Sequence, residues 1–209
     1  MPATRVRLIA PSGYPHDRAA MTRGVARLYE AGCVVDAMDV LERTELRYAG
    51  SDAERAADLN ALAMLDELPD IALATRGGYG ATRLLEHLRY DALRERLGGT
   101  GTALVGHSDF TAIQLALFAQ AGLVTFGGPM LAADFGAEVA SDFTLSRFWA
   151  TVRAAQASAT WSTSSEQLLD VEGLLWGGNL AMLCSLLQSP YFPRIEGGIL
   201  FVEDIGEPP

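Results

Sequence analysis

Cysteine is scarce in this 209-residue chain, which contains only Cys33 and Cys184. The two thiols are far apart in the sequence and form no Cys-x-x-Cys pair, which excludes a disulfide framework and a cysteine-based metal site. We expect both to be reduced residues of the hydrophobic core. The N-terminus lacks the core of about seven or more apolar residues that a signal peptide needs, and no segment approaches the roughly 20 apolar residues of a membrane span. These absences predict a cytoplasmic protein without a membrane partner.

Positive charge is also in short supply. Lys and Arg together number 16 against 26 Asp and Glu, which gives a net charge of -10. Such a chain can neutralise few phosphates, and this argues against a nucleic-acid partner. The acidic residues are spread along the sequence and indicate solubility rather than a specific partner. Hydrophobic residues make up 49% of the chain, enough for one large folded domain or for one and a half smaller ones.

Short apolar runs alternate with amphipathic stretches over residues 1–153. Alternation of this kind predicts an N-terminal α/β domain built on a doubly wound, mostly parallel sheet. We expect strands at 5–10, 33–40, 71–75, 103–106 and 123–126. We expect helices at 17–31, 51–68, 82–87, 110–120 and 142–155, with Ser51 and Glu54 forming a capping box.

The composition changes after residue 153. Residues 154–167 are rich in Ala, Ser and Thr and have no clear period, which predicts a linker. Residues 168–209 then suggest an extended segment to Trp176, a turn at Gly177-Gly178-Asn179, a helix over 180–187 and a strand over 198–204. About 40 residues are few for an independent core. We therefore expect 168–209 to be the beginning of a second, smaller α/β domain that is incomplete in this chain.

A serine lies at the apex of the sharpest predicted loop. The segment ALVGHSDFTAIQLALF at 103–118 predicts a strand, a tight turn and a helix, with Ser108 in the turn. The free N–H groups of a helix N-terminus favour negative charge there, and the N–H of Asp109 could donate to an oxyanion. Gly106 fits the Gly-x-Ser-x-Gly elbow, but Phe110 stands where the second glycine would be. On this loop alone, a helix cap formed by Ser108 or Asp109 is favoured over a nucleophile.

A glycine-rich loop, RGGYG at 76–80, follows the predicted strand at 71–75. Together with GGPM at 127–130 and the serine loop, it should lie at the carboxyl ends of the strands, where open parallel sheets bind ligands. RGGYG lacks the Gly-Lys-Ser/Thr ending of a P-loop and is too short for Gly-x-Gly-x-x-Gly. The N–H of Gly78 is a candidate second oxyanion donor, but a plain tight turn explains the loop equally well.

The chain has three histidines, and none is an obvious general base for the serine. His87 falls on a predicted helix and suggests a surface or packing residue, whereas His16 follows the first strand and could reach the same sheet edge. His107 directly precedes Ser108, and neighbours on an elbow generally diverge. No pair of histidines has metal-ligand spacing, so we expect neither a metal site nor a cofactor.

Seven segments, in the same order, resemble the LD-carboxypeptidase family, which comprises muramoyl-tetrapeptide carboxypeptidases and related microcin-immunity peptidases. The resemblance covers nearly the whole chain. The segments are IAPSG at 9–13, YAGSDAERAADLNA at 48–61, TRGGYGATRLLEHL at 75–88, VGHSDFTAIQLAL at 105–117, GGPM at 127–130, LLWGGNLAMLCSLL at 174–187 and ILFVEDIGEPP at 199–209. Several motifs in one order are far more specific than any one of them.

The resemblance implies a serine peptidase with a Ser-Glu-His triad. It places the nucleophile at Ser108 and the triad carboxylate at Glu203, which local sequence alone would not separate from a solvated strand end or from Asp204. It also implies an oxyanion hole formed by the N–H groups of Asp109 and Gly78. The motif and the local chemistry agree on all of these roles except the base.

The catalytic histidine of the family lies downstream of the Glu203 motif, and none of the three histidines in this sequence matches it. We therefore expect the histidine beyond residue 209, in a C-terminal part that this sequence omits, although a truncated protein is the other explanation. The implied substrate is a murein tetrapeptide that loses its terminal D-alanine during cell-wall recycling. Arg76 is a candidate partner for the substrate's carboxylate.

Two alternatives remain open at this point. The chain could be an immunity-type peptidase that inactivates a peptide-nucleotide antibiotic, or a non-catalytic peptide-binding remnant that retains the pocket without the base. The resemblance also raises the expectation of a homodimer.

Overall fold

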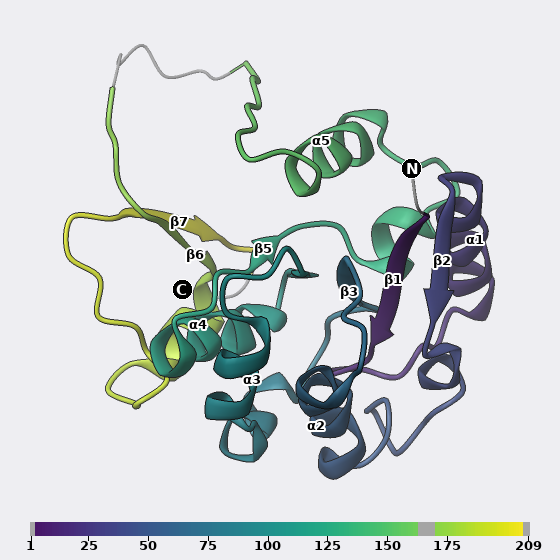
Figure 1. Ribbon diagram of the computed structural model, residues 1–209, viewed down its shortest axis with the longest axis horizontal. Helices are drawn as coiled ribbons and strands as arrows, with labels where there is room; N and C mark the ends of the chain where they lie inside the picture. The colour runs from purple at the N-terminus through teal and green to yellow at the C-terminus, as the bar shows by residue number, and fades with distance from the viewer. Residues whose placement is uncertain (1–2, 163–169, 207–209) are drawn as a thin grey trace.

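The computed structural model describes residues 3–162 and 170–206, and its largest element is a five-stranded parallel sheet (Figure 1). The strand order is β2-β1-β3-β4-β5, and every pair of neighbours is parallel. The central strands β3 and β4 are buried along their whole length, as expected for apolar runs covered on both faces. The predicted α/β fold is confirmed. The strands are β1 Thr4–Ile9, β2 Cys33–Asp36, β3 Ile71–Ala74, β4 Ala103–Gly106 and β5 Phe126–Gly127.

Helices cover both faces of this sheet (Figure 1). One hydrophobic core contains residues of α2, α3 and α4 and lies against one face, whereas the other contains residues of α1 and α5 and lies against the opposite face. The α-helices are α1 Arg18–Glu30, α2 Asp52–Asn60, α3 Tyr90–Leu97, α4 Phe110–Ala121, α5 Asp142–Val152 and α6 Leu180–Leu186. Shorter helical turns are η1 Met38–Leu41, η2 Ala61–Met64, η3 Ala81–His87 and the π-helical η4 Leu131–Phe135.

The structure confirms the predicted capping box but differs from the predicted elements in several lengths. Ser51 and Glu54 form the expected capping box at the start of α2. The strand expected at 33–40 ends at Asp36, because Ala37 adopts a left-handed conformation with a φ of 57° and starts η1. The segment expected as one helix over 51–68 is divided into α2 and η2. Helix α3 and turn η4 had no counterpart in the expected elements.

A second, two-stranded parallel sheet is formed by β6 Leu175–Asn179 and β7 Ile199–Glu203, which α6 helps to connect. The turn predicted at Gly177-Gly178-Asn179 is wrong, because these residues pair with residues 201–203 of β7. Both glycines have positive φ angles, 125° for Gly177 and 132° for Gly178, and a Cβ on Gly177 would lie 1.9 Å from the Phe201 carbonyl oxygen. Glycine here permits close strand pairing rather than a turn.

The small sheet packs on the large domain through α4. The backbone N–H of Asn179 donates a hydrogen bond to Thr111 Oγ1 at 3.1 Å, and Asn179 Oδ1 accepts one from the Met182 N–H at 3.0 Å, which caps α6. Elsewhere the small sheet is open: Leu175, Leu200 and several neighbouring apolar side chains of β6 and β7 are exposed. Of the predicted linker, residues 154–162 are exposed and have no helix or strand, and the rest lies outside the described residues.

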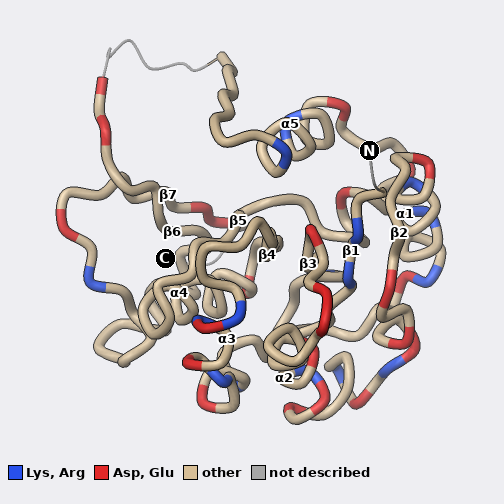
Figure 2. Tube along the Cα trace, in the orientation of Figure 1, with Lys and Arg blue, Asp and Glu red and all other residues tan. Residues whose placement is uncertain are grey.

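Figure 2 shows the acidic residues distributed over many helices and loops rather than gathered in one segment. Cys33 is buried as expected, but the expectation that Cys184 belongs to the core is wrong, because α6 presents this side chain to solvent. Within residues 3–162 and 170–206, no helix has the length and apolar character needed to cross a membrane.

Candidate active site

Ser108 occupies a strained turn between β4 and α4. Its φ of 61° lies in the left-handed region, which residues with a Cβ rarely adopt and which is concentrated at functional sites. The turn is tight: the N–H of Thr111 donates to the Ser108 carbonyl at 3.0 Å. Gly106 permits the turn, because a Cβ there would lie 2.6 Å from the Phe110 ring. This is the geometry of a strand-turn-helix elbow that lifts a serine hydroxyl above a sheet.

The glycine-rich loop after β3 faces this serine. A Cβ placed on Gly77 would lie 3.1 Å from Ser108 Oγ and 3.2 Å from Asp109 Oδ1, so any larger residue would crowd both side chains. Gly78, next along the loop, has a φ of 130°. The structure therefore brings together three of the residues singled out in the sequence, namely Gly78, Ser108 and Asp109.

Asp109 is at the N-cap position of α4, but among the described residues its side chain makes no capping hydrogen bond. Its Oδ1 instead accepts a hydrogen bond from Ser12 Oγ at 3.0 Å. Burial raises the pKa of Asp109, while the Ser12 hydroxyl, the amides of Ala81 and Gly78 and the charge of Arg76 lower it in part. The other carboxylate oxygen, Oδ2, is buried and has no hydrogen-bond partner in the described part of the chain.

Arg76 is held at the same edge of the sheet by the loop after β1. Its Nη1 donates to the Tyr14 carbonyl at 3.0 Å and also contacts His16 Nδ1. His16 thus reaches the sheet edge, as its position after the first strand predicted. His87 lies away from the site, on the surface at the end of η3. The guanidinium of Arg76 lies against the Gly13 and Gly78 backbone, near the serine loop.

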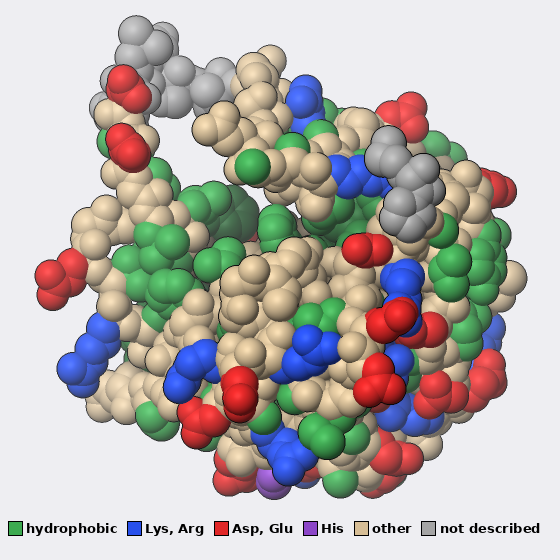
Figure 3. Space-filling model, viewed as in Figure 1, with side chains coloured by type: hydrophobic (Ala, Val, Ile, Leu, Met, Phe, Trp, Pro, Cys, Tyr) green, Lys and Arg blue, Asp and Glu red, His purple; other side chains and the backbone are tan. Residues whose placement is uncertain are grey.

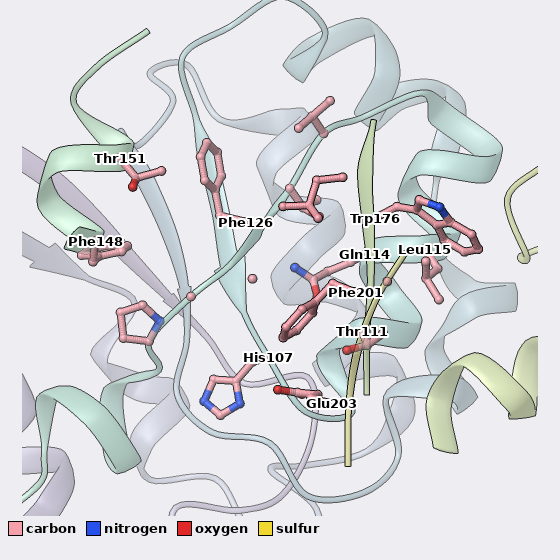
Figure 4. A pocket seen from close by; sticks show the side chains of 18 of the residues that line it. His107, Thr111, Gln114, Leu115, Phe126, Phe148, Thr151, Trp176, Phe201 and Glu203 are labelled. Atoms are coloured by element: carbon pink, nitrogen blue, oxygen red, sulfur yellow. The ribbon is translucent and has the colours of Figure 1, made fainter. Parts of the chain in front are cut away.

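Glu203 reaches the site from the other sheet, at the end of β7. It pairs in register with Asn179, whose hydrogen bond to Thr111 connects the small sheet to the first turn of α4. Glu203 Oε1 is buried and has no hydrogen-bond partner within the described residues. Figure 4 shows the Glu203 carboxylate pointing toward the ring of His107.

His107 and Asp134 form a pair that the sequence did not reveal. His107 Nε2 lies 3.3 Å from Asp134 Oδ2, and the same oxygen accepts a hydrogen bond from the Met130 N–H at 2.8 Å. The hydrogen bond to Asp134 raises the pKa of His107, burial opposes this, and the charges of Asp134, Glu203 and Asp109 raise it further. Burial raises the pKa of Asp134, but its hydrogen bonds to His107 and Met130 outweigh this, so its pKa lies below the ordinary value. Nothing in the sequence pointed to Asp134.

A cavity of about 730 Å³ opens beside this pair, between α4, α5, β5 and the small sheet. Its polar residues include His107, Asp134 and Glu203, but Ser108 is not among the lining residues. Figure 3 shows hydrophobic side chains gathered around the hollow. Aromatic side chains supply much of the wall, among them Phe126, Phe148, Trp176 and Phe201 (Figure 4), and Trp161 lines it as well. In residues 3–162 and 170–206, no group of three or more His, Cys, Asp or Glu could hold a metal ion.

Comparison with known proteins gives consistent matches along the whole chain. A Streptomyces coelicolor protein that is named as a carboxypeptidase is 37% identical over 99% of this chain and 66% of its own length. A muramoyltetrapeptide carboxypeptidase from Oxalobacter formigenes has a similar crystal structure, with a TM-score of 0.87, 41% identity and coverage of 98% of this chain and 67% of the other. The microcin C7 self-immunity protein MccF in its inactive-mutant apo state superposes with a TM-score of 0.83 at 26% identity, covering 97% and 68%.

The chain spans only part of the curated relatives that it matches: 66% of the length of the Streptomyces coelicolor protein and 63% of that of a Bacillus subtilis protein named as a murein peptide carboxypeptidase. Its family matches fall in two blocks. The LD-carboxypeptidase N-terminal domain matches residues 6–128, and the LD-carboxypeptidase C-terminal domain matches residues 172–209. As the motifs indicated, this chain belongs to the LD-carboxypeptidase family.

Proposed function

We propose that the protein is a serine-type LD-carboxypeptidase that releases terminal D-alanine from murein tetrapeptide during cell-wall recycling. The observation that carries this proposal is the left-handed conformation of Ser108 at the β4–α4 elbow, directly opposite the Gly77 backbone, in a chain of this family. A merely structural helix cap would not need a strained residue at this position. The proposal includes a cytoplasmic location and a homodimer, and it divides the chain into domains at 1–153 and 168–209 with a linker between them.

In the proposed reaction, Ser108 Oγ attacks the carbonyl carbon of the L,D-peptide bond. Its proton passes to a histidine that we place beyond residue 209, oriented by Glu203, and then to the leaving amine of D-alanine. Water hydrolyses the acyl-enzyme in a second step. The N–H groups of Asp109 and Gly78 would stabilise the oxyanion. Because the Gly78 amide lies near the Asp109 carboxylate, its participation requires this amide to turn toward the substrate.

Arg76 is the proposed partner of the substrate's terminal carboxylate. The Tyr14 carbonyl and His16 hold its guanidinium against the Gly78 backbone, so it is fixed beside the serine loop. A carboxypeptidase needs a cation near the scissile bond, because it must recognise the free carboxylate of the residue it removes.

The second candidate is an immunity-type peptidase that inactivates a peptide-nucleotide antibiotic. The aromatic walls of the cavity beside His107 and Glu203 favour it, because flat aromatic surfaces suit a nucleobase. One solved relative at 26% identity is MccF in complex with aspartyl sulfamoyl adenosine.

Both candidates are tested with the full-length protein that contains this chain. We expect the wild-type protein to release D-alanine from murein tetrapeptide. Ser108→Ala should lower kcat by about 1,000-fold or more, the order of magnitude seen when a triad residue is removed, while the variant still binds the substrate. Ser146→Ala, an exposed serine of α5, is the matched control and should be fully active. Turnover retained by Ser108→Ala would remove Ser108 from the mechanism. Faster hydrolysis of aspartyl sulfamoyl adenosine than of the tetrapeptide would favour the immunity-type function.

A further inference from the structure

The imidazole of His107 lies between two carboxylates that come from different parts of the fold. Asp134 Oδ2 of η4 lies 3.3 Å from Nε2, and the Glu203 carboxylate of β7 points toward the ring (Figure 4). Because Asp134 occupies Nε2, the ring nitrogen that faces Glu203 in Figure 4 is Nδ1. The histidine itself is held by the elbow between β4 and α4, one residue before Ser108.

A positively charged neighbour would stabilise both the Asp134 carboxylate and the Glu203 carboxylate. Asp134 is fixed by the Met130 N–H at 2.8 Å and stays ionised, because its pKa lies below the ordinary value of 3.8. It therefore acts as an acceptor, and Nε2 of His107 carries the proton. Glu203 Oε1 is buried with no partner in the described part of the chain, and a buried carboxylate without a donor is costly.

We propose that His107 is a positioning residue for Glu203: its imidazolium is held by Asp134 through Nε2 and presents Nδ1–H to the Glu203 carboxylate. This inference rests on the proposed function, in which Glu203 orients the catalytic histidine. Glu203 would then use one oxygen toward His107 and the other toward the catalytic histidine. A carboxylate oriented in this way cannot rotate freely, and a group that must orient a base within about 0.5 Å needs such support.

The same geometry argues against His107 as the base itself. Its Nε2 is engaged by Asp134, and its ring lines the cavity, whereas Ser108 Oγ faces the Gly77 backbone. The two neighbouring side chains diverge, as expected at an elbow. The charged groups around the ring are Asp134 of η4, Glu203 of β7 and Asp109 at the start of α4, and Arg147 of α5 lines the same cavity.

Nuclear magnetic resonance titration of the histidines tests this arrangement without any need for activity. Glu203→Gln and Asp134→Asn should each lower the pKa of His107 by about one unit, as expected when one close opposite charge is removed. Glu86→Gln is the matched control, because Glu86 lies 3.9 Å from the exposed His87 and should leave His107 unchanged. A His107 pKa that is the same in Glu203→Gln as in wild type would overturn the proposal.

The second readout is the pH profile of the full-length enzyme. His107→Gln keeps a neutral donor but loses the charge, so we expect kcat to fall about tenfold with KM within twofold of wild type. The fall should be largest at the pH values where wild-type His107 is protonated. An unchanged kcat and pH profile in His107→Gln, together with an inactive Ser108→Ala, would refute the positioning role alone. An active Ser108→Ala would instead refute the proposed function, while the titration still decides whether His107 binds Glu203.

Discussion

Replacing Ser108 by glycine should make the protein more stable, although it removes the proposed nucleophile. With a φ of 61°, the backbone of Ser108 lies in the left-handed region, which costs about 1–2 kcal/mol for a residue that has a Cβ. Glycine removes this strain but gains freedom in the unfolded chain, which costs about 0.4–1 kcal/mol. The difference predicts a net gain of roughly 0.5–1 kcal/mol in the free energy of unfolding. For a protein of this size, about 1 kcal/mol corresponds to 2–4 °C in Tm.

The assay is thermal and urea unfolding followed by circular dichroism, with two control variants. Ser108→Ala keeps the Cβ and the strain, so its stability should stay within about 0.5 kcal/mol of wild type. Ser146→Gly is in the middle of α5, where the backbone is helical, and should lose about 0.5 kcal/mol. A Ser108→Gly variant that is no more stable than Ser108→Ala would refute the strained-elbow argument and weaken the case for Ser108 as nucleophile.

Two further perturbations probe the parts of the site that lie outside the elbow. Gly178→Ala should lower the free energy of unfolding by about 1–3 kcal/mol and speed hydrogen exchange of the Asn179 amide. The reason is that the added Cβ would lie 2.5 Å from Thr111 Oγ1, on a backbone with a φ of 132°. The control is Gly101→Ala, which lies in open space and should change neither quantity. For His107→Gln, the loss of stability relative to wild type should be greatest between about pH 4 and pH 6.5. The pKa of His107 in the folded protein is raised above 6.5, so His107 stabilises the fold below pH 6.5, and this stabilisation is lost as the pH rises through the folded pKa. The pKa of Asp134 in the folded protein is lowered below 3.8, so the stabilisation by Asp134 is lost only as the pH falls through that lowered pKa. Urea unfolding at pH 5.5 and pH 9 measures this difference, and an equal loss at both values would contradict it.

Some features followed directly from local sequence because their physics is local. The capping box of Ser51 and Glu54 needs only residues three apart, and the apolar runs of β3 and β4 need only burial on both faces. Helix α3 was missed because it is short and begins after Arg89, whose side chain makes no capping hydrogen bond within the described residues. The glycine pair at 177–178 resembles a turn in the sequence, but in the structure it permits the close approach of β7, whose paired residues come 24 positions later in the chain.

The sequence by itself determined the family and the parallel sheet, and it singled out Ser108 as the candidate nucleophile, because seven ordered motifs and a strand-turn-helix pattern are local signals. The serine loop on its own favoured a helix cap over a nucleophile at Ser108, and only the resemblance over the whole chain reversed this. The tertiary structure added the left-handed backbone of that residue and the close approach of Gly77, where an added Cβ would lie 3.1 Å from the Ser108 hydroxyl; both depend on how β3 and β4 pack side by side. Only the fold brought His107 between Asp134 and Glu203, because these three residues belong to three elements that are distant in the chain and meet at one edge of the sheet.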